Sequence, residues 1–210
     1  SRHRILLPVS WARNVYKRQV WTVVLRPGIT FSNGDALTAQ TLADMFPIQQ
    51  SGSVSAGVVG RSGLVGVEAV GDLTAEYTLS ATNVAFAGEL ALQGLGMVFH
   101  PGLAASDPEG YTMNPIGTGA FIVETRDIDN ETVFTRNPNY WKTDAYGRQL
   151  PYLDSLAFRP IPDETTRLAS LTSGTTTGMQ SLRQATIRDA RASEGITLFE
   201  FQGNNSGGGH

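Results

Sequence analysis

The sequence of 210 residues predicts a mixed α/β or α+β fold, and its length suits one large domain or two small ones. Three observations support this prediction. Apolar, β-branched runs predict strands, and apolar residues at helical spacing follow capping residues. The strands do not alternate regularly with helices, as they do in a doubly wound fold. The composition, 40% apolar and 17% charged, is typical of a fold with a hydrophobic core.

The clearest local signals lie in the first fifty residues. Residues 20–25 form an apolar run that predicts a strand, and Asn33-Gly34 is a strong turn signal. Thr38 is expected to cap a helix over 39–46, because Leu42, Met45 and Phe46 share one helical face. A turn over 26–28 and a short strand over 29–31 complete this stretch.

The elements expected further along alternate between strands, helices and loops. In 64–80, Val65, Val67 and Ala69 fall on one side of a first strand, and Tyr77 and Leu79 belong to a second. The remaining elements are a loop over 51–63, a short helix within 85–101 that runs into a glycine-broken segment, a turn-rich linker over 105–115, strands over 120–125, 131–136, 152–161 and 196–202, helices over 163–174 and 181–195, and an unstructured end over 203–210.

No catalytic or metal-binding motif is found in the sequence. There is no cysteine, and His3, His100 and His210 are too far apart in sequence to suggest a metal site. His100 is interpreted as a strand-end residue. The acidic pairs Asp127/Asp129 and Asp163/Glu164 lie in predicted turns and are interpreted as solvated carboxylates. A binding function is therefore favoured over a reaction, and no catalytic residue, metal or cofactor is predicted.

Charge and hydropathy narrow the possible partners. The formal charge is −3, and no block of like charges occurs, so no nucleic-acid partner is expected. No window approaches the ~18 apolar residues of a membrane span. The apolar run Ile5–Val9 is shorter than the ~7–15 residues of a signal-peptide core.

Four motifs occur in a fixed order and together suggest a family. They are "WTVVLRPGITFSNGDALTAQTLADMF", "NPIGTGAFIVE", "RNPNYW" and "LPYLDSLAFRPIPDETTRLASLTSG". This ordered set resembles the solute-binding proteins of ABC importers, family 5, which take up oligopeptides, dipeptides and nickel chelates. The sequence departs from the family pattern at Thr41, at Ala120-Phe121 and at Gly178. Family members are more than twice as long, so the chain looks like a partial one.

The resemblance implies a periplasmic-binding-protein-like type II fold, of which the chain holds mostly the first lobe and the start of the second. Residues 1–38 and 112–162 are expected to form the sheet region of the first lobe, and 39–111 an inserted subdomain. Residues 163–210 are expected to form the crossover and the start of the second lobe. Residues 154–162 are the best candidate for a hinge.

The resemblance also implies a function. The protein is expected to be an extracytoplasmic receptor, periplasmic or lipid-anchored at the cell surface, and a monomer. It would capture a peptide or a similar small solute between two lobes and deliver it to ABC permease subunits. Peptide, glycoside, opine and nickel chelate remain open as solutes. The expected ligand contacts are Asn33, Gly34, Phe99, His100, Gly117 and Thr118. Two other classes stay open: an interaction module that binds no solute, and an enzyme, which the missing motifs disfavour.

The motif residues also have a structural interpretation. Gly117 and Gly119 are expected where the backbone must turn tightly. Asn137-Pro138 is expected to end a strand. Tyr140 and Trp141 are expected to cover a hydrophobic face, as scaffold rather than as ligand contacts.

Overall fold

The computed structural model describes residues 9–11, 19–92 and 94–199, and the predicted unstructured end over 203–210 lies outside them. The chain divides into two compact units, residues 1–158 and 159–210, which are described separately. The first unit holds strands β1 (Val9–Trp11), β2 (Gln19–Val24), β3 (Leu64–Gly71), β4 (Thr74–Leu79), β5 (Phe121–Asp127), β6 (Glu131–Arg136) and β7 (Ser155–Phe158), and helices α1 (Ala39–Ser51), α2 (Ser55–Ser62), α3 (Phe86–Leu92), α4 (Pro101–Ser106) and α5 (Pro108–Met113). The second holds α6 (Glu164–Thr172) and α7 (Gln184–Ala192).

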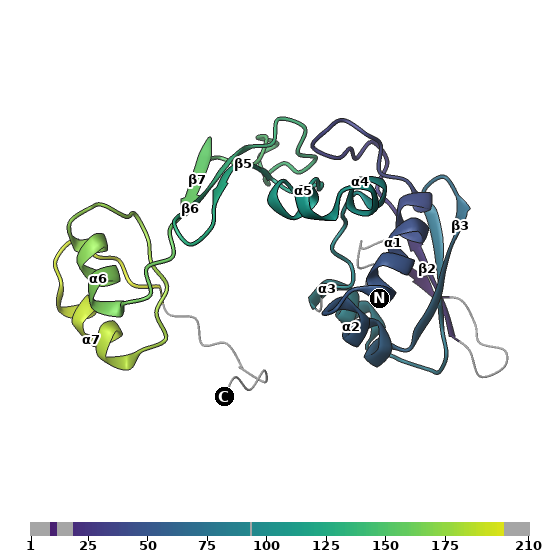
Figure 1. Ribbon diagram of the computed structural model, residues 1–210, viewed down its shortest axis with the longest axis horizontal. Coiled ribbons are helices and arrows are strands. Elements are labelled where there is room, and N and C mark those ends of the chain that lie inside the picture. The colour runs from purple at the N-terminus through teal and green to yellow at the C-terminus, as the bar shows by residue number, and fades with distance from the viewer. Residues whose placement is uncertain (1–8, 12–18, 93, 200–210) are drawn as a thin grey trace. The chain divides into compact units, whose positions relative to one another are not determined.

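The core of the first unit lies between a four-stranded antiparallel sheet and helix α1. The strand order is β1-β2-β4-β3, and α1 packs against β3 and β4 (Figure 1). The ring of Phe86 is fully buried, with centroids 5.7 Å from Trp21 and 5.9 Å from Tyr77. Leu42 and Met45 are buried on α1, so the predicted apolar face of this helix is confirmed.

The predicted hairpin over 64–80 is confirmed, but one of its faces differs from the prediction. Tyr77 and Leu79 on the second strand are buried, and Ala75 alternates into the core with them. In β3 the register shifts between Leu64 and Gly66, and Leu64 and Val67 are buried. The irregularity leaves Val65 exposed, so the predicted shared face of Val65, Val67 and Ala69 is wrong.

Helix α1 begins where the sequence predicts and ends later. The Thr38 hydroxyl accepts a hydrogen bond from the Thr41 N–H, and the Thr41 hydroxyl accepts one from the Thr38 N–H. This reciprocal pair forms a capping box, with threonine in place of the usual Glu or Gln at the fourth position. The helix continues through Pro47 to Ser51, five residues beyond the predicted end at Phe46.

Three helices lie where loops were predicted. Helix α2 occupies most of the predicted loop 51–63, because Val59 and Ser62 are buried and the helix packs on α1. Helices α4 and α5 replace most of the predicted linker over 105–115. Each begins with a proline that follows a side-chain cap, His100 for α4 and Asp107 for α5.

The predicted turns over 26–28 and at Asn33-Gly34 are confirmed. The prediction that the backbone needs glycine at positions 117 and 119 is wrong. Gly28 and Gly34 have φ of +75° and +94°, which non-glycine residues rarely adopt. The predicted strand over 29–31 contributes only an isolated bridge between Thr30 and Ala36. Gly117 and Gly119 do not have positive φ, and an added Cβ would meet nothing closer than 3.6 Å and 3.9 Å. Glycine is therefore not required there for backbone conformation.

A second sheet, with strand order β5-β6-β7, is antiparallel. Strands β5 and β6 form the predicted hairpin, whose turn includes Asp129 with φ of +66°. Strand β7 is shorter than the predicted 152–161, since its pairing with β6 ends at Ser155 and Phe158. Strand β2 pairs with β1 and β4 and with none of the strands of this second sheet.

In the second unit, the side chain of Arg167 on α6 bonds the segments before and after this helix. Its guanidinium donates to the Ile161 carbonyl at 2.9 Å and 2.7 Å, and to the Gln180 carbonyl at 2.9 Å. Asp163, which was interpreted as a solvated turn carboxylate, is exposed but also caps α6, and hydrogen bonds from the Thr166 N–H and hydroxyl lower the pKa of its carboxyl. Helices α6 and α7 are shorter than predicted, and residues 196–199 form no strand.

Residues 143–152 form a loop that is held by the carboxylate of Asp144. This carboxylate accepts bonds of 2.6 Å from the Tyr152 hydroxyl, 2.6 Å from Arg148 Nε, and 2.8 Å from the backbone N–H of both Tyr146 and Arg148. The Arg148 guanidinium also lies 5.4 Å and 5.1 Å from the ring centroids of Tyr146 and Tyr152. This carboxylate therefore binds three other residues of the loop, beside the backbone bridge between Thr143 and Gln149.

The Asp144 carboxyl is expected to titrate well below the usual range. The Tyr152 hydroxyl, and then the bonds from Arg148 and Tyr146, lower its pKa from 3.8 to about 2. Because the folded-state pKa is depressed, the stabilisation is complete above about pH 4 and is lost as the pH falls through about 2. NMR titration of the side-chain carboxyl carbon measures this value directly.

The pKa of Tyr152, whose hydroxyl donates to the Asp144 carboxylate, supplies the control. The hydrogen bond to Asp144 raises the pKa of Tyr152, so Asp144→Asn should move that pKa back towards 10.0. Two results together would contradict the proposed loop organisation: an Asp144 carboxyl that titrates near 3.8, and a Tyr152 pKa that Asp144→Asn leaves unchanged.

Candidate functional site

Three segments that are distant in sequence meet in the first unit at a surface that we call the corner: residues 31–35, 99–100 and 117–118. The Ser32 N–H donates to the Gly117 carbonyl at 2.9 Å. Phe99 and Gly117 form an antiparallel bridge. The turn at Asn33-Gly34 and the "GTG" segment are thus joined through backbone hydrogen bonds.

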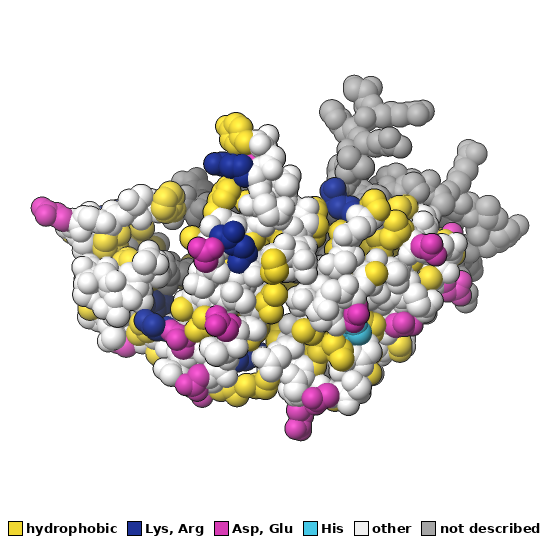
Figure 2. All heavy atoms as spheres, turned by 90° about the horizontal axis from the view of Figure 1, so that it is seen from above, with side chains coloured by type: hydrophobic (Ala, Val, Ile, Leu, Met, Phe, Trp, Pro, Cys, Tyr) yellow, Lys and Arg dark blue, Asp and Glu magenta, His cyan; other side chains and the backbone are white. Residues whose placement is uncertain are grey.

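The imidazole of His100 links two parts of the corner. Its Nδ1 accepts the Leu103 N–H at 3.2 Å and so caps α4, and its Nε2 lies 3.0 Å from Asp35 Oδ2. An accepting Nδ1 together with a donating Nε2 describes the neutral tautomer that carries its proton on Nε2. The ring also lies 5.0 Å from that of Phe31. The pair reaches the surface, where Figure 2 shows a cyan histidine side chain against a magenta acidic one.

All six predicted contact residues lie within the three segments of the corner. Asn33 and Gly34 form the turn, Phe99 and His100 lie beside it, and Gly117 is bonded to it. Thr118 is half-buried and follows Gly117 directly. His100 was interpreted as a strand-end residue, whereas the structure shows that it is the cap of α4.

Sequence reasoning missed three residues of this site. Phe31 is buried beneath His100, and the Asn33 amide donates to Asp35 Oδ2 at 2.6 Å. The Tyr111 hydroxyl accepts from the His100 N–H at 2.9 Å and donates to the Ile116 carbonyl. The spacing Asn-Gly-Asp was a usable signal for Asp35, because Asn side chains commonly bond the backbone two residues on. No local signal in the sequence pointed to Tyr111.

The "RNPNYW" motif is joined to the "GTG" segment by Asn137. This side chain is buried, and its Nδ2 donates to the Gly119 carbonyl at 2.8 Å while its Oδ1 accepts from the Asn139 N–H at 3.0 Å. Its backbone N–H donates to the Ala120 carbonyl at 2.9 Å. Trp141 does not cover a core, since it is 41% exposed and packs against the guanidinium of Arg26.

The corner is chemically suited to hydrogen bonding. It presents a carboxylate at Asp35, an amide at Asn33, an imidazole at His100 and backbone groups of the "GTG" segment. Within residues 9–11, 19–92 and 94–199, no group of three or more His, Asp or Glu side chains could hold a metal ion. In the same described ranges, no helix has the length and apolar character needed to cross a membrane.

Replacing His100 with alanine is expected to loosen the corner. The substitution removes both the cap of α4 and the bond to Asp35, which should lower the free energy of unfolding by about 1–2 kcal/mol. His100→Asn retains an acceptor for the Leu103 N–H and should lose about half as much. Urea denaturation measures both values. Equal stability of the wild type and both variants would show that His100 does not hold the corner together.

Solved structures of binding proteins share the fold of this chain. MoaA of A. tumefacien R10, solved in complex with mannopinic acid, superposes with a TM-score of 0.73 at 23% identity and covers 87% of this chain and 36% of its own. HbpA2 of Haemophilus parasuis superposes with a TM-score of 0.66 at 26% identity, covering 83% and 38%. The fold is therefore part of a type II periplasmic-binding-protein fold, as predicted.

The sequence comparisons identify the family. The family described as "Bacterial extracellular solute-binding proteins, family 5 Middle" matches residues 12–208. The nickel-binding periplasmic protein of Escherichia coli K12 is 30% identical over 173 residues, which cover 80% of this chain and 31% of the relative. The dipeptide-binding protein of the same strain is 28% identical over 145 residues, covering 67% and 26%. The chain belongs to this solute-binding family and spans about a third or less of these two relatives.

Proposed function

We propose that the protein containing this chain is the extracytoplasmic solute-binding component of an ABC importer, and that the corner forms part of the wall that the solute contacts. The meeting of the Asn33-Gly34 turn, Phe99-His100 and Gly117 in one place carries this proposal, because two of these three segments, the turn and Gly117, come from separate family motifs. Membership of the solute-binding family supports the binding function, and similarity to binding proteins rather than enzymes argues against a reaction.

The solute is a peptide or a similar small molecule. Relatives of this chain are named for nickel, heme, dipeptide and glutathione, so the family scaffold accepts several classes. Exposed backbone and amide groups at the corner suit a solute with peptide-like donors and acceptors. The chain would form most of the first lobe and the start of the second, and the boundary between its two compact units lies within the predicted hinge over 154–162. Lobe closure would present the loaded protein, a monomer in the periplasm or lipid-anchored at the cell surface, to the permease.

A thermal-shift screen of the complete protein tests the proposal. Di- to tetrapeptides, glutathione, an opine, a glycoside and a nickel–histidine chelate are added separately, and one class should raise the melting temperature. A solute present at 100 times its Kd stabilises the folded protein by about 2.7 kcal/mol, which is a readily measured shift. If no class raised the melting temperature, solute binding would be contradicted and an interaction module favoured.

Two matched variants then locate the site. Asn33→Ala should weaken binding of the active solute about tenfold, a loss of ~1.4 kcal/mol, because Asn33 lies on the proposed wall. Asn130→Ala is the control, since Asn130 also lies in an exposed turn and also bonds a nearby Asp, Asp127. Equal Kd values for the two variants would remove the corner from the binding site.

A further inference from the structure

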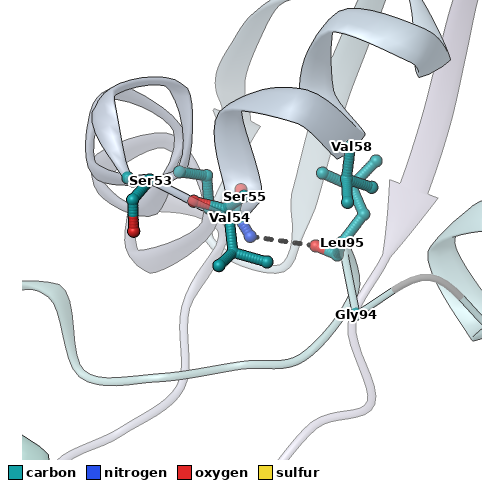
Figure 3. Close-up of a pocket in the computed structure, with 8 residues that line it drawn as sticks. Ser53, Val54, Ser55, Val58, Gly94 and Leu95 are labelled. Carbon is teal, nitrogen blue, oxygen red and sulfur yellow. Dashed lines mark hydrogen bonds between the residues drawn. The ribbon is translucent and has the colours of Figure 1, made fainter.

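A hollow of about 370 Å³ opens between the end of α1, the start of α2 and the segment at Gly94-Leu95 (Figure 3). Val54, Val58 and Leu95 supply its apolar surface, and Figure 3 shows these side chains around the open space. Its volume lies within the roughly 300–1,000 Å³ typical of small-molecule sites. None of the residues that line the hollow belongs to the corner.

The wall of the hollow is held in place by the amide of Gln49. This side chain is buried, and its Nε2 donates to the Leu95 carbonyl at 3.0 Å. The bond ties the segment at Gly94-Leu95 to α1 and satisfies a carbonyl at the edge of the hollow. On the opposite rim, at the start of α2, the Val54 side chain is 81% exposed to solvent.

The hollow and the corner are joined by a short segment of chain. Leu95 lines the hollow and Phe99 belongs to the corner, and four residues span at most ~14 Å. Val98 and Phe99 pack against the core, whereas Met97 between the two sites is 73% exposed. An exposed methionine offers an adaptable apolar surface along this path.

We propose that the hollow is a subsite for an apolar group of the solute whose polar part contacts the corner. This inference rests on the proposed function and narrows its substrate class to solutes that carry an apolar side chain or tail. An extended tetrapeptide is ~14 Å long, which matches the greatest separation that the chain between Leu95 and Phe99 allows. Burial of an apolar side chain in the hollow adds affinity without adding a hydrogen bond.

Peptide binding to the complete protein tests this subsite. The probes are tetrapeptides of alanine with either phenylalanine or serine at one end, made for both ends. At least one phenylalanine peptide should bind about tenfold or more tightly than its serine counterpart. Val54→Glu, which places a charge on the rim of the hollow, should abolish that difference. Val70→Glu is the matched control and should preserve it, because Val70 is an exposed valine on β3 that does not line the hollow.

A second measurement examines the hollow without a peptide. Methyl NMR of the complete protein with 1-hexanol should shift the resonances of Val54, Val58 and Leu95 and leave those of Val70 in place. Peptides that bind with equal affinity whether they end in phenylalanine or serine overturn the subsite while the proposed function stands. Methyl shifts without binding of any peptide support an apolar subsite and overturn a peptide as the solute. If no peptide binds and no methyl resonance shifts, the subsite is overturned, and the thermal-shift screen with the other solute classes decides the proposed function.

Discussion

Replacing Phe86 with alanine is expected to lower the free energy of unfolding of the first unit by about 3–5 kcal/mol. Phe86 is fully buried at the start of α3, and its ring contacts those of Trp21 on β2 and Tyr77 on β4. The substitution therefore leaves a cavity where the helix meets the sheet and also removes two aromatic contacts. Urea denaturation followed by tryptophan fluorescence reports on this region, because Trp21 is a neighbour of the cavity.

Val84→Ala is the control for this prediction. Val84 lies two residues before Phe86 and is 81% exposed, so its truncation should change stability by less than about 0.5 kcal/mol. A loss at Phe86 no larger than the loss at Val84 would mean that this ring is not part of the core.

Replacing Asn137 with alanine is expected to lower the free energy of unfolding by about 2–3 kcal/mol. The buried amide donates to the Gly119 carbonyl and accepts from the Asn139 N–H, so its removal leaves a carbonyl and an N–H without these partners. The loss should be seen in urea denaturation. Asn137→Asp should be at least as harmful, because its carboxylate cannot donate to the Gly119 carbonyl.

Asn139→Ala is the matched control for Asn137. Asn139 is exposed two residues further on and takes part in this network through its backbone N–H, which the substitution retains. Similar stability losses at the two positions would show that the Asn137 side chain does not join the "RNPNYW" turn to the "GTG" segment.

The elements that sequence predicted well are those whose signal is local. Thr38 and the apolar residues Leu42 and Met45 specified the start and the buried face of α1. The alternation of Ala75, Tyr77 and Leu79 specified β4, because one face of that strand is buried. In each case the residues that predict the element, through a cap or through apolar spacing, are the residues that form it.

The errors arose where tertiary packing overrides local preference. Helix α2 is rich in serine and glycine, which are poor helix formers, and it is stabilised by burial of Val59 against the core. Helices α4 and α5 are only six residues each, but Pro101 and Pro108, each at the first helical position after a capping side chain, were usable signals. The irregularity in β3 that exposes Val65 depends on pairing with β4 and has no local signature.

The candidate site was predictable in part for the same reason. The family motifs located the Asn33-Gly34 turn and Gly117, and Phe99-His100 was a candidate outside them, but only the fold shows that the three meet. The contributions of Phe31 and Tyr111 depend on segments far apart in sequence, as does the hollow beside Gln49. Spacing along the chain cannot reveal such contacts.

Amide hydrogen exchange on the complete protein, with and without the solute identified by the thermal screen, tests the central claim most directly. The claim is that the corner forms part of the wall that the solute contacts. Solute should slow exchange at residues 31–35, 99–100 and 117–118, while exchange in the β5–β6 turn at 127–130 stays unchanged. Slowed exchange elsewhere in the protein, with unchanged rates in all three segments of the corner, would contradict it.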